Sequence, residues 1–325
     1  MTVRPKVYVS RPLPDGAGDL LDAACQLHAY AEDAPVPPDV LRAALADAEG
    51  LYCVLTDRID GPLLDAAPRL KVVSQMAVGY DNIDVAACTA RGIPVGNTPG
   101  VLTETTADLT LGLMLATARR LVEAAEAVKA GQWRTWRHSW LVGTDLWGST
   151  LGILGMGRIG VAVARRAAGF GMRLLYHNRS EAPEARELGA ERVSLEELLA
   201  GSDVVSLHCP LTDETRGMVN EAFLRAMKPT AIFINTARGT MVDEAALHRA
   251  LKEGWIRAAG LDVTAVEPIP MDSPLLALPN CLILPHIGSA SEATRRRMAT
   301  MAAENLLAGL AGRRLPNCVN PEVYG

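Results

Sequence analysis

Short apolar runs alternate with longer alanine-rich segments along most of the chain, and this pattern predicts its secondary structure. The apolar runs are rich in Val, Ile and Leu, which favours strands, whereas segments such as residues 38–48 repeat apolar residues at helical spacing. Strands are expected at residues 7–10, 25–28, 50–55, 72–75, 93–95, 150–154, 173–177, 204–207, 231–235, 258–262 and 282–284. Strictly alternating strands and helices imply parallel sheets covered by helices, so the fold class is α/β.

The alternation occurs twice, and the join between the two series indicates how the chain is organised. Asn97-Thr98-Pro99-Gly100 is a turn cluster, residues 103–130 read as one or two helices, and a second series of strands begins near Thr150. The helical tail at residues 291–310 is too short to form a domain, so it is expected to pack on the first one.

We therefore predict two doubly wound parallel-sheet domains, one inserted in the other. The inserted domain is a Rossmann dinucleotide-binding domain of residues 99–287, and the split one is a flavodoxin-like substrate domain of residues 1–98 and 288–325. A ligand is expected in the cleft between two such domains, and two chain crossings would allow hinge closure.

Composition and charge exclude several classes of function. The 325 residues are 49% hydrophobic and 21% charged, which is typical of a folded chain. Lys and Arg number 32 and Asp and Glu 37, so the net charge of −5 disfavours a nucleic-acid or anionic membrane surface. No apolar run is long enough for a membrane helix or a leader after Met1, so a cytoplasmic protein is expected. The six cysteines lack CxxC spacing, which favours buried thiols and no metal site.

A glycine-rich turn follows the strand expected at 150–154 and opens the helix expected at 161–170. Its GxGxxG residues are Gly155, Met156, Gly157, Arg158, Ile159 and Gly160. The first glycine permits a tight turn, the second lets the backbone approach a pyrophosphate, and the third lets the helix pack closely on the strand. In this strand–turn–helix context the motif predicts a dinucleotide site rather than an empty turn.

The end of the next expected strand bears on the choice of cofactor. NAD sites usually carry Asp or Glu about 20 residues beyond the glycines, but this chain has Asn178-Arg179-Ser180 after residues 173–177. A carboxylate would repel the 2′-phosphate of NADP, whereas a guanidinium pairs with it. We therefore predict that NADP(H) is preferred and NAD(H) possible, the latter if Arg179 only stacks on adenine or points to solvent.

Three polar residues follow expected strands of the second series: Arg238, Glu267 and His286. Taken singly, each is more often a surface ion pair, a solvated acid or a structural histidine. Parallel strands bind ligands at their carboxyl ends, so the three together form a plausible set for reducing a 2-keto acid. Arg238 can hold the carboxylate and polarise the ketone, His286 can protonate the new alkoxide, and Glu267 can fix the tautomer of His286.

The motifs together resemble the NAD(P)-dependent D-2-hydroxyacid dehydrogenase family over nearly the whole chain. The matching stretches are Val78-Gly79-Tyr80-Asp81-Asn82, the glycine-rich turn, His208-Cys209-Pro210-Leu211-Thr212, Asn235-Thr236-Ala237-Arg238-Gly239, Gly260-Leu261-Asp262-Val263, Glu267-Pro268 and Pro285-His286-Ile287-Gly288-Ser289. Within the family the chain is most similar to glyoxylate/hydroxypyruvate reductases, as Gly131-Gln132-Trp133-Arg134-Thr135-Trp136 and Glu267-Pro268-Ile269-Pro270 indicate. One departure is Thr264-Ala265-Val266, where many relatives carry an aromatic and further acids.

The resemblance implies roles for individual residues. Arg238 would bind the substrate carboxylate together with the backbone N–H groups of Val78 and Gly79, His286 would be the acid/base, and Glu267 would support it. Asp262 would lie near the nicotinamide and Ser289 near the substrate. The implied cofactor contacts are Thr106, the six residues of the glycine-rich turn, Asn178, Arg179, Ser180, Cys209, Pro210, Thr236, Ala237, Asp262 and Gly288.

The tryptophans at 133, 136 and 140 admit two interpretations. Their i, i+3, i+7 spacing predicts a core stripe on a helix, above all for Trp133. The resemblance instead implies a dimerisation arm, from which Trp140 would reach the neighbouring subunit's active site and limit substrate size. A homodimer is therefore expected.

The reaction implied is NADPH-dependent reduction of glyoxylate to glycolate or of hydroxypyruvate to D-glycerate. One alternative is another substrate on the same scaffold, such as 3-phosphoglycerate or an aryl-pyruvate. The other is a nucleotide-sensing, corepressor-like binding protein, because such proteins can keep Arg238, Glu267 and His286. Turnover of a panel of keto acids separates these alternatives.

Overall fold

The computed structural model describes residues 4–13 and 16–325, so part of the start that we read as lacking a leader lies outside the described residues. The chain divides into a discontinuous unit, residues 1–102 and 290–325, and a continuous unit, residues 103–289. The boundaries expected at 98/99 and 287/288 lie a few residues away, because the helix that starts at Thr103 and the loop through Ser289 belong to the continuous unit. None of the described helices is long and apolar enough to span a membrane.

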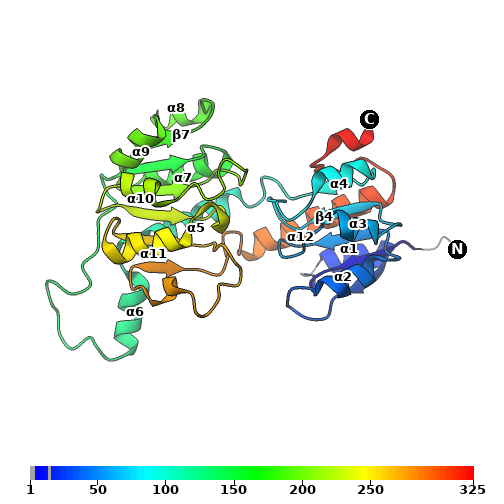
Figure 1. The fold of residues 1–325 in the computed structure, drawn as a ribbon, viewed down its shortest axis with the longest axis horizontal. Helices are drawn as coiled ribbons and strands as arrows, with labels where there is room; N and C mark the ends of the chain where they lie inside the picture. Colours follow the sequence, from blue (N-terminus) through cyan, green and yellow to red (C-terminus); the bar gives the residue numbers. More distant parts are fainter. Residues whose placement is uncertain (1–3, 14–15) are drawn as a thin grey trace. The chain divides into compact units, whose positions relative to one another are not determined.

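The discontinuous unit is built on a parallel five-stranded sheet of order β2-β1-β3-β4-β5 (Figure 1). Its strands are β1 (Lys6–Val9), β2 (Gln26–Ala29), β3 (Gly50–Cys53), β4 (Val72–Gln75) and β5 (Val95–Gly96). Its helices are α1 (Ala17–Ala24), α2 (Pro38–Leu45), α3 (Gly61–Asp65), α4 (Val85–Ala90), α12 (Glu292–Leu310) and the 3-10 helix η3 (Pro321–Tyr324). The strand order is the flavodoxin-like one that the sequence predicted.

Both faces of this sheet are buried. Leu41, Leu45 and Ile59 belong to the cluster on one face, and Leu21 and Leu306 to the cluster on the other. The helix of the tail, α12, packs against α1, β3 and β4. The returning tail therefore completes the core of the unit in which the chain begins.

The continuous unit has a parallel seven-stranded sheet of order β12-β11-β10-β9-β6-β7-β8, the doubly wound Rossmann arrangement. Its strands are β6 (Thr150–Leu154), β7 (Arg173–His177), β8 (Glu191–Arg192), β9 (Val204–Leu207), β10 (Ile232–Asn235), β11 (Ala258–Leu261) and β12 (Cys281–Ile283). Its helices are α5 (Thr103–Ala118), α6 (Leu121–Lys129), α7 (Arg158–Ala168), α8 (Pro183–Glu187), α9 (Leu195–Gly201), α10 (Glu221–Ala226), α11 (Glu244–Glu253), and the 3-10 helices η1 (Gly239–Met241) and η2 (Pro274–Ala277).

Two apolar clusters cover the two faces of this sheet. Leu113, Met114 and Val163 of α5 and α7 belong to one, and Phe223 and Leu247 of α10 and α11 belong to the other. Fully buried strands such as β10, which begins with Ile232, Phe233 and Ile234, contain continuous apolar runs for this reason.

The interpretation of the tryptophans as a core stripe is wrong. Residues 130–149 form no helix, and Trp133 and Trp136 are 63% and 80% exposed. The helix preceding them, α6, ends at Lys129, and the chain then turns at Gly131, which has a φ of +67°. Figure 1 shows α6 and the segment after it extending away from the sheet of the continuous unit.

Candidate active site

The glycine-rich turn joins β6 to α7 and has the close packing that its spacing predicts. Gly155 has φ +96°, and a Cβ there would lie 2.4 Å from the backbone N of Cys209. A Cβ on Gly160 would lie 2.3 Å from the carbonyl oxygen of Gly155. At Gly157 the same atom would meet nothing within 4 Å, so this part of the turn has the open space that a bound phosphate needs.

The first turn of α7 supplies the donors for an anion. Gly157 is its N-cap residue and has no side chain to satisfy the first backbone N–H groups. Met156 is buried in the apolar core beneath the turn, whereas Arg158 is exposed at the helix start. The site therefore fits a pyrophosphate, which would be bound by backbone N–H groups and by the helix dipole.

The loop after β7 is held at both ends by hydrogen bonds that the sequence did not reveal. The Asn178 side-chain oxygen accepts from the Met156 backbone N–H (2.9 Å), which ties this loop to the glycine-rich turn. Arg192 of β8 donates to the carbonyl oxygens of Asn178 (3.0 Å) and Arg179 (2.9 Å). Arg179 and Ser180 are exposed beyond these anchors.

Arg192 was missed because β8 has only two residues and both are polar, so it has no apolar pattern to recognise. The β8 strand pairs with β7 through Leu175 and Tyr176, which places Arg192 beside the loop after β7. In the sequence, Arg192 can be recognised only as a charged residue between two turns.

Side chains of α5 lie beside the ends of β10 and β12. Thr110 Oγ lies 3.1 Å from the Thr236 hydroxyl, and a Cβ on Gly288 would lie 3.5 Å from the Thr106 methyl. Asn235 shapes the turn after β10, because its side chain accepts from the Ala237 N–H and donates to the Arg238 carbonyl. Cys209 and Pro210 follow β9 after one intervening residue, His208. The predicted cofactor residues of the continuous unit therefore follow the carboxyl ends of successive strands, apart from Thr106 on α5.

His286 and Glu267 are in direct contact. The Nδ1 atom of His286 lies 2.7 Å from Glu267 Oε2, and both side chains are about one-third exposed. Glu267 follows β11 and His286 follows β12, so two adjacent parallel strands deliver the pair to one edge of the sheet. This geometry leaves Nε2 of His286 as the ring nitrogen not engaged by the carboxylate.

Asp262 anchors the loop that carries His286. Its backbone carbonyl accepts from the His286 N–H (2.9 Å), and its two carboxylate oxygens accept from the N–H groups of Ile287 (2.8 Å) and Gly288 (2.7 Å). Burial raises the pKa of the Asp262 carboxyl, while the hydrogen bonds from these two N–H groups act in the opposite direction. Asp262 is thus a buried support, and Ser289 follows the loop that it holds.

The turn that carries Arg238 packs on the loop that carries Glu267. A Cβ on Gly239 would lie 1.9 Å from the backbone carbon of Thr264, so only glycine allows this approach. Arg238 itself is half-buried, and its guanidinium donates to the Ala237 carbonyl (2.8 Å). The structure therefore brings the turns of Arg238, Glu267 and His286 to the same edge of the sheet.

Val78 and Gly79 lie in the discontinuous unit, in the turn after β4. Their carbonyl oxygens accept from Asn97 Nδ2 (2.8 Å) and Gln75 Nε2 (2.6 Å). Among the described residues, nothing accepts a hydrogen bond from the backbone N–H of Val78 or Gly79. Trp140, in the segment after α6, is half-buried. The Arg137 guanidinium lies over the Trp140 ring, 4.2 Å from the ring centroid.

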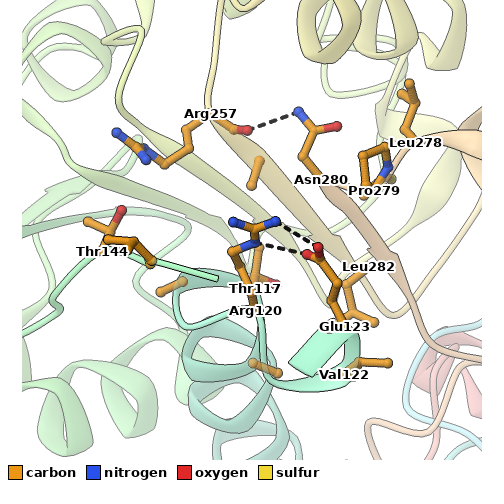
Figure 2. A pocket seen from close by; sticks show the side chains of 16 residues that line it. Thr117, Arg120, Val122, Glu123, Thr144, Arg257, Leu278, Pro279, Asn280 and Leu282 are labelled. Atoms are coloured by element: carbon orange, nitrogen blue, oxygen red, sulfur yellow. Dashed lines mark hydrogen bonds and ion pairs between the residues drawn. The ribbon is translucent and has the colours of Figure 1, made fainter. Parts of the chain in front are cut away.

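A cavity of about 440 Å³ lies at the opposite edge of the continuous unit's sheet (Figure 2). It is lined by the first residues of β11 and β12 and by the junction of α5 and α6, where Arg120 is bound to Glu123 through two hydrogen bonds. Strand amino ends, not carboxyl ends, form this cavity, so it is separate from the edge that carries His286.

The fold and the site define a nicotinamide-nucleotide-dependent dehydrogenase. Residues 111–288 match the NAD-binding domain of the D-isomer specific 2-hydroxyacid dehydrogenases. The chain is 52% identical to a glyoxylate reductase of Korarchaeum cryptofilum, over 99% of this chain and 97% of that protein. It is 50% identical to human glyoxylate reductase/hydroxypyruvate reductase, over 96% of this chain and 97% of the human protein.

A solved structure gives the same result. An NADPH-dependent glyoxylate/hydroxypyruvate reductase from Sinorhizobium meliloti, in complex with NADP and malonate, is 35% identical with a TM-score of 0.86, covering 98% of this chain and 97% of that one. The chain belongs to the D-isomer specific 2-hydroxyacid dehydrogenase family.

Proposed function

We propose that this protein is an NADPH-dependent reductase that converts glyoxylate to glycolate and hydroxypyruvate to D-glycerate. The observation that carries the proposal is the His286–Glu267 pair, 2.7 Å apart, at the carboxyl edge of a sheet that also carries a dinucleotide turn. Relatives about 50% identical over nearly the full chain are glyoxylate reductases, which supports the choice of substrate.

The chemistry follows from the roles of three side chains. A nicotinamide cofactor held at the glycine-rich turn would supply the hydride that C2 of the keto acid takes up. His286, held by Glu267 through Nδ1, donates its proton from Nε2 to the carbonyl oxygen, so the product gains one hydride and one proton. Glu267 stabilises the charged imidazole that must donate. Arg238 pairs with the substrate carboxylate and polarises the ketone.

For Val78 and Gly79 the role in binding the carboxylate rests on the family resemblance. Their N–H groups, which have no acceptor among the described residues, support that assignment. Ser289 and Asp262 are assigned to the substrate and nicotinamide ends on the same basis, and Asp262 supports the His286 loop through the contacts above.

The preference for NADPH over NADH is supported by the loop after β7. Asn178 gives this position no carboxylate to repel a 2′-phosphate, and its oxygen is already engaged by Met156. Arg192 holds the carbonyls of Asn178 and Arg179, and because carbonyl and following N–H point in opposite directions, the N–H groups of Arg179 and Ser180 face away from Arg192. These donors and the Arg179 guanidinium fit a phosphate. NADH remains a second, weaker cofactor.

A homodimer is supported by an apolar surface on α6 and the segment that follows. Its exposed residues are Leu121, Val122, Val128, Trp133, Trp136, Val142 and Trp147, with Trp136 and Trp147 about 80% exposed. Exposed apolar surface of this extent marks a protein contact. We assign it to a second copy of the chain, whose active site Trp140 would reach.

The initial rate of NADPH consumption with hydroxypyruvate and with glyoxylate tests the proposed function. The His286→Ala variant should lose about 10²-fold or more in kcat/KM, because it removes the proposed proton donor, while its Kd for NADPH stays unchanged. The His248→Ala variant on α11 is the matched control and should keep the wild-type rate. Normal reduction by His286→Ala would exclude the mechanism.

Further substrates distinguish the alternatives. Phenylpyruvate and 3-phosphohydroxypyruvate should be reduced at least tenfold more slowly than hydroxypyruvate. Faster turnover of either one would keep the enzyme class and change the substrate. NADPH binding without turnover of any keto acid would favour the nucleotide-sensing alternative.

A further inference from the structure

The loop between β11 and Glu267 is closed on itself by two hydrogen bonds. The Thr264 N–H donates to Glu267 Oε1 (3.2 Å), and the Thr264 hydroxyl donates to the Val266 carbonyl (2.8 Å). Glu267 Oε2 is left to bind His286 Nδ1. These hydrogen bonds couple Glu267 to the turn. The position of the Glu267 side chain therefore depends on the contacts between that turn and the rest of the unit.

Glu244, from a different element, holds it. The Glu244 side chain is the first of α11, and its Oε1 accepts from the Ala265 backbone N–H at 2.7 Å. Ala265 lies between the two residues that close the loop. A hydrogen bond from an N–H to an ionised carboxylate is about twice as strong as a neutral one, and a carboxylate in the first turn of a helix is stabilised by the helix dipole.

The start of α11, which carries Glu244, is itself held in place. Asp243 caps α11 by accepting from the Ala246 N–H (3.0 Å), and η1, which begins at Gly239, leads from the Arg238 turn into this helix. Gly239 packs on Thr264 with no room for a Cβ. The packing sets how near the loop lies, whereas the bond to Glu244 sets its orientation.

We propose that Glu244 is a positioning residue for the reduction: it orients the 264–267 loop so that Glu267 stays on Nδ1 of His286. This inference rests on the proposed function. Besides Glu244, Asp262 of the continuous unit interacts electrostatically with both His286 and Glu267, and the turn of Arg238 packs on the same loop. Asp262 cannot take over from Glu267, because both of its carboxylate oxygens already accept N–H groups. Arg238 carries the wrong charge to replace it.

The test compares the Glu244→Ala and Glu244→Gln variants in steady-state reduction of hydroxypyruvate, with kcat and KM determined separately. We expect Glu244→Ala to lower kcat/KM by about tenfold to a hundredfold, as a small misplacement near the reacting groups does. The loss should fall on kcat and leave KM near the wild-type value, because the variant leaves Arg238 and the other carboxylate-binding groups in place. Glu244→Gln should recover most of the rate, because its amide oxygen can accept the Ala265 N–H.

Glu253→Ala is the matched control. Glu253 is the last residue of the same helix and accepts from the Trp255 indole N–H, so removing it changes the helix and the charge but not the loop. Its kcat and KM should match those of the wild type. The Kd for NADPH, measured from nicotinamide fluorescence, should be the same in all these variants.

A double-mutant cycle separates positioning from a general structural effect. If Glu244 acts through Glu267, then Glu244→Ala should cost little in a Glu267→Gln background. Additive losses, or a loss that falls on KM with kcat unchanged, would overturn the proposal. If Glu244→Ala does not fold, Glu244→Asp tests the same point: it keeps the charge but withdraws the oxygen by one methylene, and an unchanged kcat in that variant would also overturn it. Normal reduction by His286→Ala would instead contradict the proposed function itself.

Discussion

At the scale of single residues, the site depends on backbone conformations and contacts that residue identity does not announce. His286 has φ +53°, which is costly for a residue with a side chain and persists only where its surroundings enforce it. Here the enforcement comes from Asp262, which holds the N–H groups of His286, Ile287 and Gly288. The sequence identified His286 and Asp262 as candidates, but the link between them is a property of the fold.

Asn178 is a second residue whose contacts the sequence did not reveal. The predicted preference for NADP(H) rested on the absence of an acidic residue at this position. The sequence did not indicate that the side-chain oxygen accepts the Met156 N–H. Glu244 was not a candidate at all, because a glutamate at the start of a helix is usually explained by the helix dipole alone.

His208 makes stability depend on pH. Burial lowers the pKa of this histidine from 6.5 to about 3, and its Nε2 is bonded to Ser206 (2.8 Å). Between these pH values the unfolded chain takes up a proton that the folded chain cannot, so stability falls as pH falls below about 6.5. At pH 5 the loss attributable to this residue is about 2 kcal/mol.

The measurement is urea unfolding of the wild type and of His208→Gln at pH 7.5 and pH 5. The wild type should lose about 2 kcal/mol more than the variant between the two values. Equal losses in the two proteins would show that His208 is protonated in the folded state.

At the scale of elements, predictability followed burial. Strands β4, β6, β7 and β9 match their predicted bounds, because each contains at least two successive apolar residues that are buried. The two-residue strand β8 has two exposed polar residues and left no such run. In the segment after α6 the prediction was wrong for a different reason. The apolar side chains there are at helical spacing, but the segment is irregular and these side chains are exposed.

The pairing of β8 with β7 gives a prediction about cofactor choice. The Arg192→Ala variant should raise the Kd for NADPH about tenfold and change the Kd for NADH much less, because it frees the loop that presents donors to the 2′-phosphate. Arg173→Ala is the control, since Arg173 is also exposed on this edge but pairs with Glu191. Fluorescence titration of the wild type and the two variants with each nucleotide gives the six Kd values needed.

Equal weakening by the two substitutions would mean that Arg192 contributes only general charge. Equal affinities of the wild type for NADPH and NADH would contradict the preference itself.

At the scale of the whole molecule, the fold class was predictable because two series of alternating strands and helices allow few arrangements. The insertion followed from a tail too short to stand alone. The oligomeric state could not be derived in the same way, since the sequence does not show whether a tryptophan is exposed or buried. The structure adds this information for the apolar residues on α6 and the segment after it.

Assembly is tested by sedimentation. The wild type should sediment as a species of twice the chain mass, and a Trp136→Ser/Trp147→Ser variant should be a monomer at low micromolar concentration, because it removes the two most exposed indoles of that surface. Leu20→Ser, an exposed apolar residue on α1, is the control and should stay dimeric. A monomeric wild type, or a dimeric double variant, would contradict the assignment.

The discontinuous unit has a consequence for synthesis on the ribosome. Its sheet is translated early, but α12, which covers β3 and β4, emerges only after the intervening residues 103–289. At about 5–20 residues per second the nascent sheet waits roughly ten to forty seconds with the part of β3 and β4 that α12 covers still exposed. The continuous unit can fold during that interval, so the part of the chain made first is completed last, and chaperones have that window in which to bind Tyr52 and Val72, the residues that α12 later helps to bury.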